Sequence, residues 1–173
     1  MNKIIIAGSV GAGKTTFAKP LSKKLSIPHF ELDHLYWLPN WVARPEDERI
    51  KIAKEKIAPL SKWITCGNHF YLHEITWDKA DTVIWLDYSI WLCLWRALKR
   101  ALRSMIKREK VVGCNIESLR RFLSRDSILL YIFKNYKRIK RRYTGMINSQ
   151  EYQHIKLVRL RSPREAKEWL ERV

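Results

Sequence analysis

Gly8-Ser9-Val10-Gly11-Ala12-Gly13-Lys14-Thr15 follows directly after the apolar run Ile4-Ile5-Ile6-Ala7 in this chain. The stretch fits the pattern G-x-x-x-x-G-K-[ST], and its place predicts a loop that joins a first strand to a helix. Glycines let such a loop turn its backbone N–H groups inward toward phosphate oxygens, and the helix that follows adds the positive end of its dipole. We therefore interpret the stretch as a phosphate-binding loop rather than a glycine-rich turn without a ligand.

The residue types of this loop predict a nucleoside triphosphate and a magnesium ion as its ligands. Lys14 would reach the β- and γ-phosphates, and Thr15 would offer its hydroxyl to Mg²⁺. The implied cofactors are ATP and Mg. The expected cofactor-binding residues of the loop are Gly8, Ser9, Gly11, Ala12, Gly13, Lys14, Thr15 and Thr16.

Length and composition bound the class of protein. The 173 residues suit one domain with a substantial core, and the hydrophobic content of 46% excludes a disordered chain. The formal charge of +17 favours polyanionic partners such as nucleotide phosphates, nucleic acid or an acidic membrane face, although a solvated basic surface without a further partner explains it equally well. With no leader and no long apolar run, we expect a cytoplasmic protein without membrane contact, of undetermined oligomeric state.

The three cysteines are too few and too scattered for a disulfide framework, and their spacing matches no zinc pattern. Reduced thiols are therefore expected. A metal site is the alternative if the loops of four residues meet in space: His29, His34, Cys66 and His69.

Predicted strands and helices alternate along the chain. Strands are expected at 3–7, 28–32, 63–66, 81–87 and 155–160, and helices at 14–25, 46–57, 89–106 and 164–172, the last one opened by Pro163. The strand from Asp81 to Asp87 is apolar on both faces, as a buried parallel strand should be. This alternation predicts a parallel sheet with right-handed crossovers.

The remaining segments carry most of the positive charge. The helix at 89–106 is amphipathic, and its apolar side is expected to pack against the sheet rather than lie on a membrane. That side comprises Ile90, Trp91, Leu94, Leu98, Ala101, Leu102 and Met105. Residues 107–114 are charged and show no periodicity, which makes them a candidate mobile segment. Residues 116 to about 143 are predicted to be mostly helical with a bend near 124–127, and they end in Lys134, Lys137, Arg138, Lys140, Arg141 and Arg142.

Taken together, these motifs resemble the small P-loop kinases of the adenylate kinase type, and most closely the bacterial topology modulation proteins. The resemblance extends over essentially the whole chain, and its most specific part is Trp91-Leu92-Cys93-Leu94-Trp95-Arg96. It implies an α/β, three-layer P-loop NTPase fold with a five-stranded parallel sheet in the order 2-3-1-4-5. It also implies a single domain, residues 1–173, with an acceptor-binding region at about 33–75 and a short lid between helices at about 103–142.

The resemblance also implies roles for several cations. Arg96 and Arg100, one helical turn apart, match the arginines that open the lid, where one stacks on adenine and the other contacts the transferring phosphate. Arg138, with Lys134 beside it, would supply cations from the helix that returns from the lid. The loop containing Arg161 and Pro163 would pass over the adenine.

Two departures from the family pattern change the expected site. Adenylate kinases carry a carboxylate where this chain has Cys66, and an arginine that grips the acceptor phosphate is missing from Gly67-Asn68-His69-Phe70. Asp33, at the end of the second strand, is therefore the leading carboxylate, either ordering Mg²⁺ through water or accepting a proton from the acceptor hydroxyl. Arg44 is the candidate for the missing grip, and Asn68 is a further candidate acceptor contact.

The catalytic residues expected on this interpretation are Lys14, Asp33, Arg96 and Arg100. The reaction that the resemblance implies is Mg-dependent transfer of the ATP γ-phosphate to a small acceptor, a nucleotide or a metabolite. The alternative is a nucleotide-binding regulator of DNA topology, or an ATPase, whose basic surface touches DNA without sequence preference. A third hypothesis is a nucleotide-dependent protein-interaction module without turnover.

Overall fold

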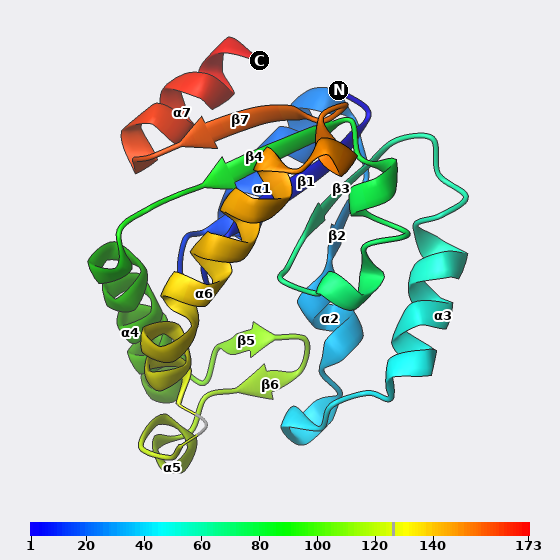
Figure 1. Cartoon of the computed structure of the whole chain (residues 1–173). Helices are drawn as coiled ribbons and strands as arrows, with labels where there is room; N and C mark the ends of the chain where they lie inside the picture. Colours follow the sequence, from blue (N-terminus) through cyan, green and yellow to red (C-terminus); the bar gives the residue numbers. More distant parts are fainter. Residues whose placement is uncertain (126) are drawn as a thin grey trace.

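A parallel sheet forms the middle of the molecule (Figure 1), and the computed structural model describes residues 1–125 and 127–173. The strands of this sheet lie in the order β2-β3-β1-β4-β7, and each pairs in parallel with its neighbours. The predicted order 2-3-1-4-5 is confirmed, with β7 as the fifth strand of the sheet. Their bounds are β1 (Lys3–Gly8), β2 (His29–Glu31), β3 (Trp63–Cys66), β4 (Thr82–Leu86) and β7 (Lys156–Leu160).

Helices cover both faces of the sheet. Because side chains alternate along β1, Ile4 and Ile6 join one core with α1, α4 and α7, whereas Ile5 and Ala7 join a second core with α3 and the C-terminal half of α6. The predicted three-layer arrangement is therefore confirmed. The helices are α1 (Lys14–Leu25), α2 (Leu32–Tyr36), α3 (Glu46–Lys56), α4 (Ile90–Lys107), α5 (Leu119–Phe122), α6 (Ile128–Asn148) and α7 (Pro163–Arg172).

Short 3₁₀ turns occur at Pro39–Trp41, Phe70–Leu72, Trp77–Lys79 and Gln150–Tyr152. Among the described residues, no helix has the length and apolar character needed to cross a bilayer.

Helix α4 buries a different face from the one its large apolar residues predict. Its fully buried residues are Cys93, Ala97, Ala101 and Ser104, whereas Trp91 is 74% exposed and Leu102 is 43% exposed. The physical reason is that the backbone of α4 approaches the phosphate loop closely. The carbonyl of Cys93 would lie 2.2 Å from a Cβ added to Gly11, so only small side chains fit between α4 and the phosphate loop. The prediction of core packing is therefore wrong for Trp91 and Leu102.

Residues 107–114 are more ordered than their lack of periodicity predicts. Strands β5 (Lys110–Val112) and β6 (Asn115–Ile116) form an antiparallel hairpin that turns at Gly113, whose φ is +55°. The buried amide of Asn115 accepts a hydrogen bond from the Trp41 N–H at 2.8 Å and donates one to the Leu38 carbonyl at 2.9 Å. These tertiary contacts, which periodicity does not report, tie the hairpin to the segment after α2.

The long helix predicted from residue 116 onward is two helices, α5 and α6. Ser118 caps α5 by accepting the N–H of Arg121 at 3.2 Å, so the helix begins after residue 118 rather than at 116. The predicted bend near 124–127 falls between the two helices, and residue 126 lies outside the described residues.

Candidate functional site

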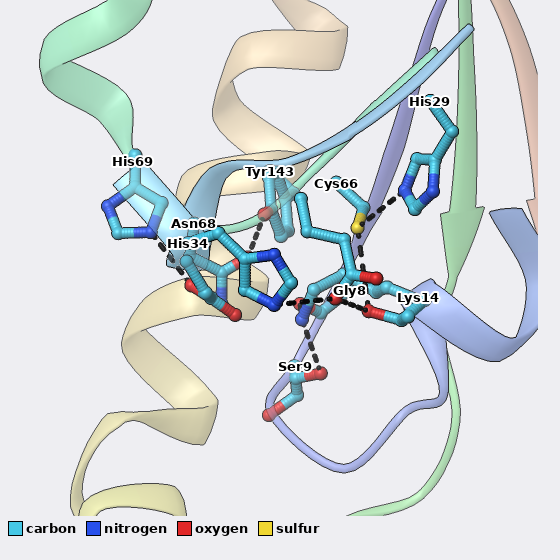
Figure 2. Close-up of polar contacts among 12 residues, drawn as sticks. Gly8, Ser9, Lys14, His29, His34, Cys66, Asn68, His69 and Tyr143 are labelled. Atoms are coloured by element: carbon cyan, nitrogen blue, oxygen red, sulfur yellow. Dashed lines mark hydrogen bonds and ion pairs between the residues drawn. The ribbon is translucent and has the colours of Figure 1, made fainter. Parts of the chain in front are cut away.

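The phosphate loop lies between β1 and α1, where the motif predicts it. Lys14 Nζ donates hydrogen bonds to the carbonyls of Gly8 and Ser9, each at 3.0 Å, so the ammonium folds back over its own loop (Figure 2). Burial lowers the pKa of Lys14, and Asp33 is the largest opposing influence. Gly11 and Gly13 hold φ of +82° and +91°, a region that favours glycine, so the pattern of the motif is required by the backbone.

A hydroxyl and a carboxylate meet at the start of α1. Thr15 Oγ1 donates to Glu31 Oε2 at 3.1 Å and lies 3.6 Å from Cys66 Sγ. Cys66 also lies 3.2 Å from His29 Nε2, and burial raises the pKa of its thiol to about 12. The Thr15 hydroxyl thus has a carboxylate beside it even though the last residue of β3 is a cysteine.

Sequence reasoning missed Glu31. The signal that could have found it is register, because Glu31 is the last residue of β2 and pairs with Cys66 in β3. In a parallel sheet, the carboxyl ends of the strands share one edge, so a terminal glutamate on β2 lies on the side of the phosphate loop.

Asp33 lies in the first turn of α2, two residues beyond the end of β2, rather than at the strand end where it was expected. His69 Nε2 lies 2.8 Å from Asp33 Oδ1, and 49% of the Asp33 side chain is exposed. Burial raises the pKa of Asp33. The hydrogen bond and charge of His69, together with the charges of Lys14 and Arg100, lower it by more, so its pKa lies below its ordinary value. Asp33 is therefore an ionised, accessible carboxylate facing the loop.

Arg96 contacts the phosphate loop directly. Its Nη1 donates to the carbonyl of Ala12 at 2.9 Å, and its guanidinium carbon lies 5.5 Å from the centre of the Tyr88 ring. Arg100, one turn further along α4, has a pKa that burial lowers and the charge of Asp33 raises. Since Arg100 also acts on Lys14, these three groups of the expected catalytic set lie within electrostatic reach of one another.

Aromatic and cationic side chains of α6 contact the segment after β3. Tyr143 donates its hydroxyl to Asn68 Oδ1 at 2.6 Å, so α6 fixes the side chain of Asn68 (Figure 2). Arg142 places its guanidinium 3.7 Å from the centre of the Phe70 ring. The Tyr131 pKa is raised by burial and by Asp33 and lowered by Arg138, so these groups lie within electrostatic reach of one another. Tyr143 and Arg142 were not predicted from the sequence.

Arg44 lies in the segment that joins α2 to α3, and its guanidinium hydrogen-bonds to neighbouring groups. Its Nε donates to the Leu35 carbonyl at 3.0 Å, and its Nη1 lies 3.3 Å from Glu48 Oε2. Arg49, which sequence reasoning did not single out, is buried between two tyrosine rings, 4.5 Å from the centre of Tyr36 and 4.7 Å from that of Tyr71.

The loop after β7 lies at the same edge of the sheet as the phosphate loop, because β7 and β1 run in parallel with β4 between them. Ser162 caps α7 by accepting the N–H of Glu165 at 3.2 Å, and the Glu165 carboxylate accepts the N–H of Arg161 at 2.8 Å, an arrangement that resembles a capping box with Pro163 at the first helical position. Burial raises the pKa of Tyr88 to about 12, while the charge of Arg96 lowers it and that of Glu165 raises it to smaller extents. Tyr88 therefore lies beside Arg96 and within electrostatic reach of Glu165 in the first turn of α7.

The alternative metal site does not form. Among the residues that the structure describes, no group of three or more His, Cys, Asp or Glu side chains is placed to hold a metal ion. His29 is directed to Cys66, whereas His69 is directed to Asp33.

No protein-family model matches the chain. The uncharacterized protein YqaC of Bacillus subtilis (strain 168) is 35% identical over 65 residues, which are 37% of this chain and 36% of that protein. The match thus covers little more than a third of the curated relative, and its function is not described by its name.

Solved structures match over almost the whole chain. Shikimate kinase from Bacteroides thetaiotaomicron covers 99% of this chain, and the match spans 95% of that protein with a TM-score of 0.58 and 14% identity. A second match is deoxyadenosine kinase from M. mycoides with products dCMP and dCDP bound. The match spans 98% of this chain and 94% of that protein, with a TM-score of 0.58 and 18% identity. The fold is that of the small P-loop kinases. At such identities the likeness extends to the fold alone, so the chemistry has to be argued from the side chains of this chain.

Proposed function

We propose that the protein is an ATP-dependent phosphotransferase that moves the γ-phosphate of ATP to a hydroxyl of a small acceptor. The observation that carries the proposal is the position of Asp33. Among the charged groups that shift the pKa of Lys14, its carboxylate has the largest effect, yet about half of its side chain is open to solvent. A carboxylate that faces both the phosphate lysine and open space is suited to accept the proton of an acceptor hydroxyl.

The residues at the loop fit a magnesium ion. The Thr15 hydroxyl and the Glu31 carboxylate are hard oxygen donors 3.1 Å apart, and Asp33 adds a second carboxylate nearby. When bound, the ion would neutralise charge on the β- and γ-phosphate oxygens. Thr15 would hold it directly, whereas Glu31 and Asp33 would hold it through water.

The remaining loop and helix residues would bind and orient ATP. The backbone of residues 8–16 and the Lys14 ammonium would hold the phosphates, with Lys14 exchanging its two carbonyl contacts for phosphate oxygens. Arg96, supported by Tyr88, would lie against the adenine together with the loop containing Arg161 and Pro163. Arg100 would face the transferring phosphate, where a cation stabilises the charge of the transition state.

The acceptor would lie between α2, the segment after β3, and α6. Asn68 and Arg138 are the proposed contacts, and Arg142 is added to them because it stacks on Phe70. Arg44 stays a weaker candidate, since its guanidinium is already engaged by Leu35 and Glu48.

A screen with Mg-ATP tests the phosphotransferase. Purified protein is given nucleoside monophosphates, nucleosides including deoxyadenosine, and hydroxylated metabolites including shikimate, and ADP release is measured with and without each acceptor. We expect at least one acceptor to raise ADP release well above the acceptor-free rate, and Lys14→Ala to abolish that increase. ADP release that no acceptor changes would contradict the proposal and favour an ATPase.

A nucleotide-binding regulator of DNA topology is the second candidate, and the cationic face of α6 favours it. Lys134, Lys137, Arg138 and Arg141 are all exposed. If this face binds DNA through its phosphates, affinity should fall steeply with salt and show little sequence preference. A filter-binding titration at two salt concentrations checks this. Sequence-selective binding that salt does not weaken would contradict simple electrostatic binding and point to a dedicated regulator.

A further inference from the structure

Helix α4 presents an apolar stripe to solvent along its length. Five side chains one helical turn apart form what we call the α4 stripe: Trp91, Trp95, Leu98, Leu102 and Ile106. Their exposed fractions are 74% for Trp91, 61% for Trp95, 43% for Leu102 and 80% for Ile106, with Leu98 half-buried between them. In Figure 1, α4 lies at the left edge of the molecule with α6 on its inner side.

The α4 stripe is larger than the scattered apolar residues of an ordinary surface. At these exposures the two tryptophans alone offer roughly 300 Å² of aromatic surface. The stripe spans residues 91–106, which is about 22 Å of helix at 1.5 Å per residue. Contiguous apolar patches of several hundred Å² on a monomer usually mark an interaction surface.

The proposed phosphotransferase site does not account for this surface. The opposite face of α4 carries the contacts to the phosphate loop, through the Cys93 backbone beside Gly11 and the Arg96 guanidinium on Ala12. The α4 stripe points away from these contacts, because the side chains of the small inner face lie about half a turn from it. A partner on the stripe would therefore leave the nucleotide loop uncovered.

The charge beside the stripe narrows the choice of partner. Lys99 and Arg103 are exposed on the same helix, Lys107 and Arg108 follow at its end, and α4 contains no acidic residue. A second copy docked on the same stripe would bring these cations together, in a chain whose formal charge is already +17. The charge therefore disfavours self-association and favours an anionic partner.

We propose that the α4 stripe docks on the surface of an anionic lipid bilayer, with α4 lying in the plane of the interface. A helix with tryptophan and aliphatic residues on one side and Lys or Arg beside them is typical of interfacial membrane binding. Single-stranded nucleic acid would use the tryptophans and cations but not Leu98, Leu102 and Ile106. The expectation that this helix packs against the sheet rather than on a membrane rests on burial of Trp91 and Leu102, and their exposure removes that reason.

Vesicle sedimentation tests the proposal with the full chain. The probes are vesicles of phosphatidylcholine alone and vesicles that also contain phosphatidylglycerol. We expect the protein to pellet with the acidic vesicles only. We expect Trp91→Ser with Trp95→Ser, and separately Lys99→Gln with Arg103→Gln, to weaken binding about tenfold or more. The matched controls are Val42→Ser, an exposed apolar residue, and Lys51→Gln with Lys54→Gln, an equal loss of charge on α3. Both should bind like the parent.

The variants also need to fold, so their thermal midpoints and ATP affinities are compared with those of the parent. Because the substituted side chains are exposed, both quantities should be unchanged. Folded stripe variants that pellet as well as the parent, or equal binding to neutral vesicles, would overturn the proposal. A dimer in sedimentation equilibrium that the tryptophan variant abolishes would assign the stripe to a second copy instead. Loss of oligonucleotide binding in that variant, without vesicle binding by the parent, would assign it to nucleic acid.

Discussion

Thr15 donates a hydrogen bond of 3.1 Å to Glu31 across the end of β3. Thr15 lies in the first turn of α1 after β1, Glu31 ends β2, and β3 lies between β1 and β2. The last residue of β3 is Cys66, whose thiol lies 3.6 Å from the Thr15 hydroxyl. A carboxylate from the neighbouring strand thus reaches the Thr15 hydroxyl beside Cys66, where the resemblance to adenylate kinases implied a carboxylate on β3 itself.

The first prediction concerns Lys14. Lys14→Ala should weaken ATP binding at least about tenfold, because a charge-assisted contact to phosphate contributes roughly 1.5–3 kcal/mol. Isothermal calorimetry measures the affinity, and Lys23→Ala, an exposed lysine on the same helix, is the control. Among the described residues, the hydrogen bonds of the Lys14 ammonium go to carbonyls of its own loop, so the fold should be retained. Equal affinities of Lys14→Ala and the parent would contradict nucleotide binding at this loop.

The second prediction separates the two carboxylates. Asp33→Asn should keep ATP affinity and lower turnover about a hundredfold or more, as expected for loss of a general base. Glu31→Gln should instead raise the Mg²⁺ concentration needed for half-maximal rate, because Glu31 contacts Thr15 and Asp33 does not. Coupled ADP release across a Mg²⁺ titration, with the acceptor found in the screen, distinguishes them. Normal turnover by Asp33→Asn would show that its assignment is wrong.

Sequence patterns predicted the fold and the loop because both depend on local signals. The apolar run at 4–7 and the glycines of the loop are contiguous, and alternating strands and helices restrict the topology strongly. Glu31 was missed because its role depends on the register of β2 with β3. The inner face of α4 was missed because large apolar residues suggest the buried side, whereas Gly11 requires small ones there. The position of Asn115 depends on tertiary hydrogen bonds that no periodicity reveals.

The third prediction concerns acid stability. Asp87, whose side chain is 5% exposed, pairs with Lys140 at 2.9 Å and with Arg159. Burial raises the Asp87 pKa, but Lys140 and Arg159 lower it by more, so the pKa lies below its ordinary value of 3.8. A carboxylate with a depressed folded-state pKa stabilises the fold above its unfolded pKa, and this contribution is lost as pH falls through the folded value. The temperature at the midpoint of thermal unfolding should therefore fall when the pH is lowered below about 4.

Asp87→Asn isolates that contribution. At neutral pH it should destabilise the protein by about 1–3 kcal/mol, a modest value because Lys140 and Arg159 are partly exposed. It should also reduce the loss of stability between about pH 6 and about pH 3. Denaturant unfolding at several pH values measures both effects, with Glu55→Gln, an exposed acid of α3, as control. An unchanged pH dependence in Asp87→Asn would show that other acids dominate.

The last prediction concerns Cys66. Burial raises the pKa of its thiol to about 12, so the residue stays neutral and supplies no negative charge beside Thr15. Cys66→Asp would place a carboxylate there, and we expect it to raise turnover or lower the Mg²⁺ concentration needed for half-maximal rate. Cys66→Asn is the matched neutral control. The double variant Cys66→Asp with Glu31→Gln should recover the Mg²⁺ response that Glu31→Gln alone loses, because the new carboxylate takes over beside the same hydroxyl. If both variants fold and the double variant responds to Mg²⁺ like Glu31→Gln alone, Cys66 does not occupy the magnesium-ordering position.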